Sequence, residues 1–487
     1  MTAGFDFAAR RRAGVLLHPT SLPGRPDHGD LGHAAYRFVE FLAAAGISIW
    51  QTLPLGPVHD DGSPYQCLSA HAGDPRLISL DWLQARGWLD ASALDCDRRQ
   101  CLQQAFEGFR RQATEAEQQA FAEFCRQQAY WLEDYALYAA IRESQARRGW
   151  PDWPAPLRDR QAAALQQAAE TLADSIALVK FGQYVFFSQW LELKNYAHEH
   201  GVFLFGDMPI FVAHDSSDVW SRRDYFLLDE QGQPTVVAGV PPDYFSETGQ
   251  RWGNPLYDWE RMQADGFQWW QQRMQTQLEL FDLIRIDHFR GFEACWEIPA
   301  AEETAINGHW RKAPGEALLG SLQAAFAGLP LVAEDLGLIT EEVEALRRRF
   351  GLPGMRILQF AFGSGPDNPY LPHNHERNTV VYTGTHDNDT TRGWFEALDE
   401  AGKKALADYL GHEPGDMPWP LIRMALASVA GMAIIPLQDV LGLGSEARMN
   451  IPGTTEGNWS WRFSEGATTE AIAARLRELV SCYGRLA

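Results

Sequence analysis

The chain has 487 residues, of which 45% are apolar and 22% are charged, a composition that provides a large core and excludes a disordered chain. The 42 basic residues against 64 acidic residues give a formal net charge of −22, which would repel nucleic acid and anionic lipid over much of the surface. We therefore expect a soluble protein without nucleic-acid or membrane partners, whose charge does not affect neutral substrates.

Short apolar runs bounded by turn residues predict eight β-strands. Helical patterns separate most of these runs, and strands joined by crossover helices are parallel. Length alone is compatible with one domain or two, but eight such units favour one catalytic (β/α)8 barrel over 1–487, because this fold accommodates long insertions. The predicted strands are Gly14–Leu17, Ile47–Leu53, Val202–Asp207, Leu283–Asp287, Leu331–Asp335, Met355–Phe360, Thr379–Asp387 and Ala433–Gln438.

Two of the intervening segments and one segment after the last strand show clear helix signals. Apolar residues recur at helical spacing over 36–42, and this helix ends at Gly46. Thr340 is a predicted N-cap, followed by an acidic first turn and a basic last turn at Arg347–Arg349. We expect these arginines to be surface residues that compensate the helix dipole, and not a binding patch. Another helix is predicted over Thr469–Cys482.

Two long segments between strands predict insertions in the barrel. The region from about 79 to 179 is rich in Gln, Ala, Arg and Glu, which favours a helical subdomain because a structureless loop of that length is improbable. The region from about 211 to 265 is rich in Gly, Pro, Asp and aromatic residues and follows the third strand. Loops at that end of a barrel strand build substrate sites, so we expect a substrate-binding loop region there.

Three of the predicted strands end with a carboxylate, namely Asp287, Glu334 and Asp387. The carboxyl ends of barrel strands meet at the face where active sites are found. Retaining cleavage of a glycosidic bond needs a carboxylate nucleophile and a carboxylic acid about 5–5.5 Å apart. The pattern therefore indicates glycosyl transfer, although each carboxylate taken alone could instead cap the following helix.

Arg285 strengthens the catalytic interpretation of Asp287. The two residues are two positions apart on one strand, so both side chains point into the barrel. An adjacent Arg keeps a carboxylate ionised and oriented, as a nucleophile requires. Glu334 would need the opposite environment, a poorly solvated pocket that raises its pKa. Asp387 could bind sugar hydroxyls, with His386 as a further donor.

These segments resemble a known family. Arg285–Phe292, Ala333–Gly337 and Tyr382–Thr390 look like the catalytic motifs of the amylomaltases, the 4-α-glucanotransferases of glycoside hydrolase family 77 in the α-amylase clan. Further similar segments are spread over nearly the whole chain: His18–Pro23, Leu53–Pro57, Ser63–Gln66, Gly206–Phe211, Trp252–Tyr257 and Arg448–Gly453. The resemblance implies a single-barrel form, and the chain has no room after the barrel for the C-terminal β-domain that is usual in α-amylases.

The resemblance also implies roles for individual residues. Asp287 corresponds to the nucleophile, Glu334 to the general acid/base and Asp387 to the carboxylate that stabilises the transition state. The implied sugar contacts are Tyr65, Asp207, Trp252, Arg285, His288, His386 and Asn450.

Some of these positions have competing interpretations. Tyr65 and Trp252 could be core residues, and Asp207 could hold other side chains in place without touching sugar. Asp74 stands where the family pattern has Asn, which affects the expected contacts of the outer sugar subsites and not the three carboxylates.

The implied activity is 4-α-glucan transfer by retaining double displacement, with α-1,4-glucans and maltooligosaccharides as substrates. An α-glucan hydrolase using the same carboxylates is the first alternative. Asp387-Asn-Asp389 could instead be the metal-binding motif of a nucleotide-sugar glycosyltransferase, but no phosphate-binding Gly-rich loop accompanies it. The last alternative is a glucan-binding protein that has lost catalysis.

The remaining expectations concern the environment of the protein. The 6 scattered cysteines are predicted to be buried free thiols in a reducing cytoplasm. The apolar stretch after Arg12 is interrupted at His18 and Pro19, so it is too short for a signal-peptide core. We expect a cytoplasmic enzyme, a monomer or weak homo-oligomer, whose mechanism needs no metal or organic cofactor.

Overall fold

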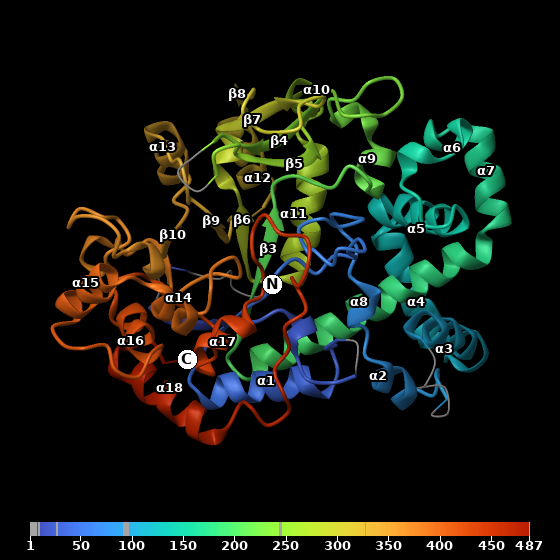
Figure 1. Ribbon diagram of the computed structural model, residues 1–487. Coiled ribbons are helices and arrows are strands. Elements are labelled where there is room, and N and C mark those ends of the chain that lie inside the picture. The colour runs from blue at the N-terminus through green and yellow to red at the C-terminus, as the bar shows by residue number, and fades with distance from the viewer. Residues whose placement is uncertain are drawn as a thin grey trace.

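The computed structural model describes residues 7, 10–25, 28–90, 97–242, 246–326 and 328–486. Eight parallel strands form a nearly closed barrel in the order β10-β11-β12-β1-β2-β3-β6-β9 (Figure 1). All eight predicted strands are present, and the barrel prediction is confirmed. Their bounds are β1 Arg12–Leu16, β2 Ile49–Gln51, β3 Phe203–Pro209, β6 Leu283–Asp287, β9 Leu331–Ala333, β10 Gly354–Ile357, β11 Thr379–Tyr382 and β12 Met432–Pro436.

Apolar side chains fill the space inside the barrel and the layer between strands and helices. The strand residues are buried almost without interruption, as expected for parallel strands covered on both faces. Gly14 marks a close approach inside this packing, because a Cβ atom there would lie 2.4 Å from Cδ1 of Ile434. The tight packing gives the strand ends fixed positions for functional side chains.

Helices surround the barrel, and the three predicted helices are among them. The outer helices are α1 His33–Ala44, α11 Gln268–Leu280, α12 Gly315–Ala325, α13 Glu341–Arg349, α14 Thr391–Ala397, α15 Glu400–Leu410, α16 Trp419–Ala427, α17 Leu437–Val440 and α18 Glu470–Cys482. The expectation of a surface arginine cluster on α13 is wrong at Arg347, which is 2% exposed, whereas Arg348 and Arg349 are exposed. Arg347 points toward the barrel because it pairs with a buried carboxylate.

The segment between β2 and β3 is helical. Figure 1 shows most of its helices gathered on one side of the barrel, with the long α8 running from them to the strands. Its helices are α2 Leu80–Ala85, α3 Arg98–Gln112, α4 Glu115–Gln127, α5 Ala129–Ser144, α6 Ala155–Arg158, α7 Ala162–Thr171 and α8 Ala173–Glu199. The limit predicted at 179 falls inside α8, which continues as the crossover helix before β3.

A second, antiparallel sheet lies outside the barrel, in the order β5-β4-β7-β8 (Figure 1). Strands β4 Val236–Val240 and β5 Gln250–Pro255 come from the insertion after β3. Strands β7 Ala294–Pro299 and β8 His309–Lys312 come from the segment after β6. This sheet was not predicted from the sequence. The same insertion contains α9 Ser217–Ser221 and α10 Trp259–Ala264.

Short 3-10 helices connect several of these elements. They are η1 Pro19–Ser21, η2 Pro75–Leu77, η4 Trp150–Asp152, η5 Arg223–Tyr225, η6 Phe289–Phe292, η7 Leu358–Phe360, η8 Pro372–Asn374 and η9 Ser445–Ala447. Most of them belong to the connections in which the site residues lie. Within the described ranges, no helix has both the length and the apolar character needed to cross a membrane.

The cysteines depart from expectation in burial and in bonding. Four of them are free thiols, Cys67, Cys125, Cys295 and Cys482, but only Cys295 of these four is buried, so the prediction of burial is wrong for the other three. Cys101 is disulfide-bonded, so the prediction of free thiols is wrong there, and Cys96 lies outside the described residues.

Candidate active site

The three carboxylates lie where barrel strands end. Ile286 of β6 is opposite Ala333 of β9, so Asp287 and Glu334 are the next pair along the same register. The Glu334 N–H donates to the Ile286 carbonyl at 3.0 Å, which extends the ladder by one residue. Strand β11 ends at Tyr382, so the prediction that this strand ends on Asp387 is wrong, and Asp387 lies in the loop that follows it. The register therefore places Asp287 and Glu334 side by side at the barrel opening.

None of the three carboxylates is a helix N-cap. The cap position is His288 for η6, Thr340 for α13 and Thr390 for α14. The competing capping interpretation is therefore wrong at each strand.

Arg285 joins two of the carboxylates at the barrel opening. Its Nη1 donates to Oδ1 and Oδ2 of Asp207 at 2.8 and 2.7 Å, and its Nη2 donates to Oδ1 of Asp287 at 2.7 Å. Burial alone would lower the pKa of Arg285, but the charges of Asp207 and Asp287 raise it well above its ordinary value. The guanidinium therefore stays charged and fixes Asp287, whose side chain is 30% exposed and accessible to a substrate.

Glu334 has the environment of a proton donor. The residue is 8% exposed, and its carboxylate accepts N–H groups from His288 at 2.7 Å and Leu336 at 3.0 Å. Burial raises the pKa of Glu334 to about 7, assisted by the charge of Asp287 and opposed by Arg285 and the two N–H donors. At neutral pH a substantial fraction of Glu334 is therefore protonated, as general acid catalysis requires.

This pKa predicts a falling limb in the pH profile. Glu334 is protonated below pH about 7 and ionised above it, so kcat/KM for a neutral maltooligosaccharide should fall about tenfold per pH unit above that point. The measurement is kcat/KM for maltotriose from pH about 5 to about 9. Glu334→Gln is the control and should lack this limb. A profile without a falling limb in the unaltered protein would contradict the acid role.

Asp387 is held by two side chains. The Nδ2 of Asn450 donates to its Oδ1 at 2.6 Å, and His386 Nε2 lies 3.3 Å from its Oδ2. Although burial works to raise the pKa of Asp387, His386 and Asn450 lower it below its ordinary value. The pKa of His386 is correspondingly raised, because Asp387 outweighs the effect of burial. Asp387 thus remains ionised, and its side chain is 47% exposed.

The aromatic and histidine residues predicted to bind sugar line the same opening. The Tyr65 hydroxyl donates to Oδ2 of Asp207 at 2.7 Å, and the Tyr65 ring is stacked on His386 with centroids 5.0 Å apart. Trp252 meets His288 edge-on at 4.8 Å. Tyr65 and Trp252 are both partly exposed, which favours substrate contact over core packing.

Asp207 is the most deeply buried of the predicted sugar ligands, at 2% exposed. Its carboxylate is occupied by Arg285 and the Tyr65 hydroxyl, and burial raises its pKa. This geometry favours the interpretation in which Asp207 orients its partners.

Sequence reasoning missed Arg448. Its Nη2 donates to the Asp387 carbonyl at 2.7 Å, and its Nε donates to the Asn450 carbonyl at 2.8 Å. Arg448 therefore fixes the backbone of both partners in the Asp387 cluster. It lies in the similar segment Arg448–Gly453, so its proximity to Asn450 was the available signal.

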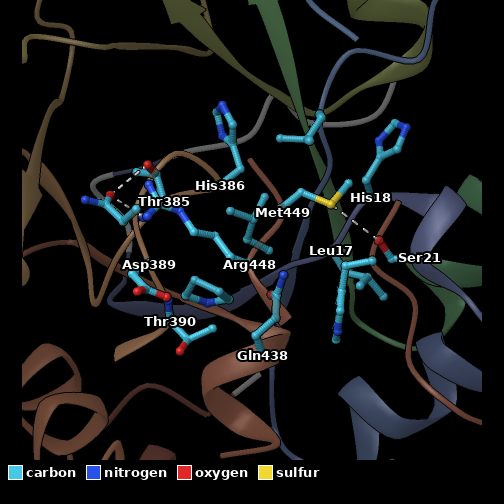
Figure 2. Close-up of a pocket in the computed structure, with 15 residues that line it drawn as sticks. Leu17, His18, Ser21, Thr385, His386, Asp389, Thr390, Gln438, Arg448 and Met449 are labelled. Carbon is cyan, nitrogen blue, oxygen red and sulfur yellow. Dashed lines mark hydrogen bonds between the residues drawn. The ribbon is translucent and has the colours of Figure 1, made fainter. Parts of the chain in front are cut away.

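A cavity of about 30 Å³ lies next to His386. Figure 2 shows His386 and Thr385 at one side and His18 at the other, with Arg448 and Met449 between them. A volume of this size suits one or two water molecules and not a sugar ring. We therefore do not expect this cavity to bind a sugar.

The alternative metal-binding motif has no support from the geometry. Asp389 accepts the Ser445 hydroxyl at 2.7 Å and the Thr390 N–H at 2.7 Å, whereas Asp387 has other partners. In the part of the chain that the structure describes, no three His, Cys, Asp or Glu residues are grouped to hold a metal ion.

Comparisons with known proteins find similarity along nearly the whole chain. The family model described as 4-alpha-glucanotransferase matches residues 17–468. A 4-alpha-glucanotransferase of Thermus thermophilus is 51% identical, with 98% of this chain and 99% of that protein covered. One from Synechocystis sp. is 48% identical, with 98% of each chain covered.

A solved structure shows the same overall architecture. The amylomaltase from Streptococcus agalactiae in complex with acarbose has a TM-score of 0.93 and 37% identity, with 98% of this chain and 100% of that chain covered. The structural agreement extends over the barrel and both insertions, because nearly all of each chain is matched.

Proposed function

The chain belongs to the 4-alpha-glucanotransferase family, and on that premise we propose that Asp287, Glu334 and Asp387 carry out the transfer reaction. The observation that carries the assignment is the contrast between two neighbouring carboxylates. Asp287 is ion-paired with Arg285, whereas burial raises the pKa of Glu334 to about 7. Two adjacent carboxyl groups with opposed environments are the arrangement that separates a nucleophile from a general acid.

In the first step, Asp287 attacks the anomeric carbon of an α-1,4-glucan. A bond forms between its carboxylate oxygen and that carbon while the bond to the leaving glucan oxygen breaks. Glu334 gives its proton to that oxygen, so the departing chain leaves as a neutral alcohol. The ionised Asp387 stabilises the positive charge that develops on the sugar ring.

In the second step, Glu334 acts as a base. It takes the proton from the 4-hydroxyl of an acceptor glucan, and the acceptor oxygen displaces Asp287 from the anomeric carbon. Two inversions restore the α configuration. The exposed faces of Tyr65 and Trp252 suit stacking on sugar rings, and such contacts favour an acceptor glucan over water.

The other proposed contacts come from polar groups around the opening. His288 has no hydrogen-bond partner for its buried Nε2 among the described residues, so this atom is available to a sugar hydroxyl. Burial lowers the pKa of His288 to about 4, which keeps the ring neutral. The amylomaltase from Streptococcus agalactiae was solved with acarbose, and we propose that the corresponding opening in this chain binds α-glucans.

Two broader expectations remain predictions. We propose that the helical segment after β2 and the segment 211–265 act as insertions of a single catalytic unit, the second of which contributes Trp252 to the opening. The cytoplasmic location and the monomeric or weakly oligomeric state stay as predicted from the sequence.

Incubation with maltotriose alone tests the function. The products are measured by chromatography over time. We expect glucose to appear together with a ladder of longer maltooligosaccharides, because the acceptor is another glucan. EDTA should not change the rate if no metal takes part. Glucose and maltose without longer products would instead make water the acceptor and favour the hydrolase alternative.

A further inference from the structure

The side chain of Asp335 joins β9 to β10 where the barrel closes. These two strands are the ends of the sheet order. The Ala333 N–H donates to the Pro353 carbonyl at 2.8 Å. One step further along, the Met355 N–H donates to Oδ1 of Asp335 at 2.6 Å. In an ordinary parallel strand pair, a backbone carbonyl would accept the Met355 N–H. Here the Asp335 carboxylate takes the place of that carbonyl.

Two arginines face the other oxygen of this carboxylate. Oδ2 of Asp335 lies 3.3 Å from Nη1 of Arg356 and 3.4 Å from Nε of Arg347. Asp335 is 5% exposed and Arg347 is 2% exposed. Arg347 also donates to the Leu352 carbonyl at 2.9 Å. Buried ion pairs of this kind are weak evidence for stability but are well suited to fixing one arrangement of the chain.

Gly354 shows that the backbone leaves room for this carboxylate. A Cβ atom at Gly354 would lie 2.3 Å from Oδ2 of Asp335. Any other residue at this position would therefore displace the carboxylate or the strand. The packing of Gly354 against Asp335 therefore fixes where β10 lies relative to β9. We call this junction of β9 and β10 the barrel seam.

Asp335 follows Glu334 directly in the chain, so the seam fixes the backbone of the residue that donates the proton. We propose that Asp335 is a positioning residue that holds the Glu334 carboxyl group in reach of the glycosidic oxygen. The Leu336 N–H, which binds Glu334, belongs to the same short segment. This inference rests on the role proposed above for Glu334.

The test compares two donors that carry the same maltosyl group. Maltotriose needs a proton on its leaving glucose, whereas α-maltosyl fluoride releases fluoride without one. In Asp335→Asn the amide oxygen still accepts the Met355 N–H, but the charge that faces both arginines is removed. We expect turnover of maltotriose to fall at least about tenfold, while the first-turnover burst of fluoride changes less than about threefold.

Asp282→Asn is the matched control. Asp282 also joins two strands, since it accepts the Leu204 N–H at 2.8 Å and lies 2.9 Å from His198 Nε2, but it precedes β6 and lies at the opposite end of the barrel. This variant should affect both donors by the same factor. If Asp335→Asn slowed the reactions of maltotriose and α-maltosyl fluoride by the same factor, or slowed neither, the positioning role would be overturned.

Arg356→Lys provides a second variant if Asp335→Asn does not fold. Arg356 is less buried than Arg347, and Lys keeps the charge with a shorter reach. We expect maltotriose turnover to fall more than the fluoride burst in this variant too, but by a smaller factor than in Asp335→Asn. An equal loss of rate with both donors would contradict the proposal. Glu334→Gln must also slow maltotriose more than α-maltosyl fluoride in the same assay. If it does not, the proposed role of Glu334 fails. If only the Asp335 and Arg356 variants lack this difference between the donors, this inference alone fails.

Discussion

Asp287→Ala should abolish transfer and leave the fold intact. We expect kcat on maltotriose to fall by about 10⁴-fold or more, because no other carboxylate replaces the nucleophile. Arg285 keeps both hydrogen bonds to Asp207 in this variant, so its buried charge remains paired. The melting temperature should therefore stay unchanged or rise, since active-site carboxylates commonly cost stability.

The measurements are product formation from maltotriose and thermal unfolding of the same preparation. Asp416→Ala is a suitable control, because Asp416 is exposed and its carboxylate pairs with Arg475 on the surface. It should leave kcat unchanged. A normal rate in Asp287→Ala would remove Asp287 as the nucleophile.

Glu334→Gln should separate the two halves of the acid/base role. Turnover of maltotriose should fall by about 10²- to 10⁴-fold, since the leaving glucan no longer receives a proton. Reaction with α-maltosyl fluoride should still form a covalent adduct, which then persists because no base activates the acceptor.

The Gln side chain cannot reproduce both hydrogen bonds of Glu334, so a second variant is needed. Glu334 accepts N–H groups from His288 and Leu336 on its two oxygens, and a Gln side chain has only one acceptor oxygen. Glu334→Ala should be made in parallel to show that the adduct does not depend on this mismatch. An equal loss of rate with maltotriose and with α-maltosyl fluoride would show that Glu334 is not the acid.

The strands and the paired residues on one strand could be predicted from local patterns. Eight apolar runs bounded by turns predicted the barrel, and the two-residue spacing of Arg285 and Asp287 placed both side chains on one face, where they are in contact. The second sheet could not be predicted in this way. β4 pairs with β7, and these strands come from insertions that β6 separates in the chain.

The support of the site depends on tertiary contacts that no local pattern reveals. Arg347 has the position of an exposed basic residue in the last turn of a helix, but it is buried because Asp335 faces it. Arg448 holds Asp387 through a backbone carbonyl 61 positions away in the chain. The sequence shows both residues, but their partners become evident only once the barrel is closed.

Locating the trapped sugar tests the central claim most directly. Glu334→Gln is incubated with α-maltosyl fluoride and digested, and the peptide that carries the maltosyl group is identified by mass spectrometry. We expect the label on the side chain of Asp287. A label on Asp207 or Asp387, or no labelled peptide at all, would contradict it.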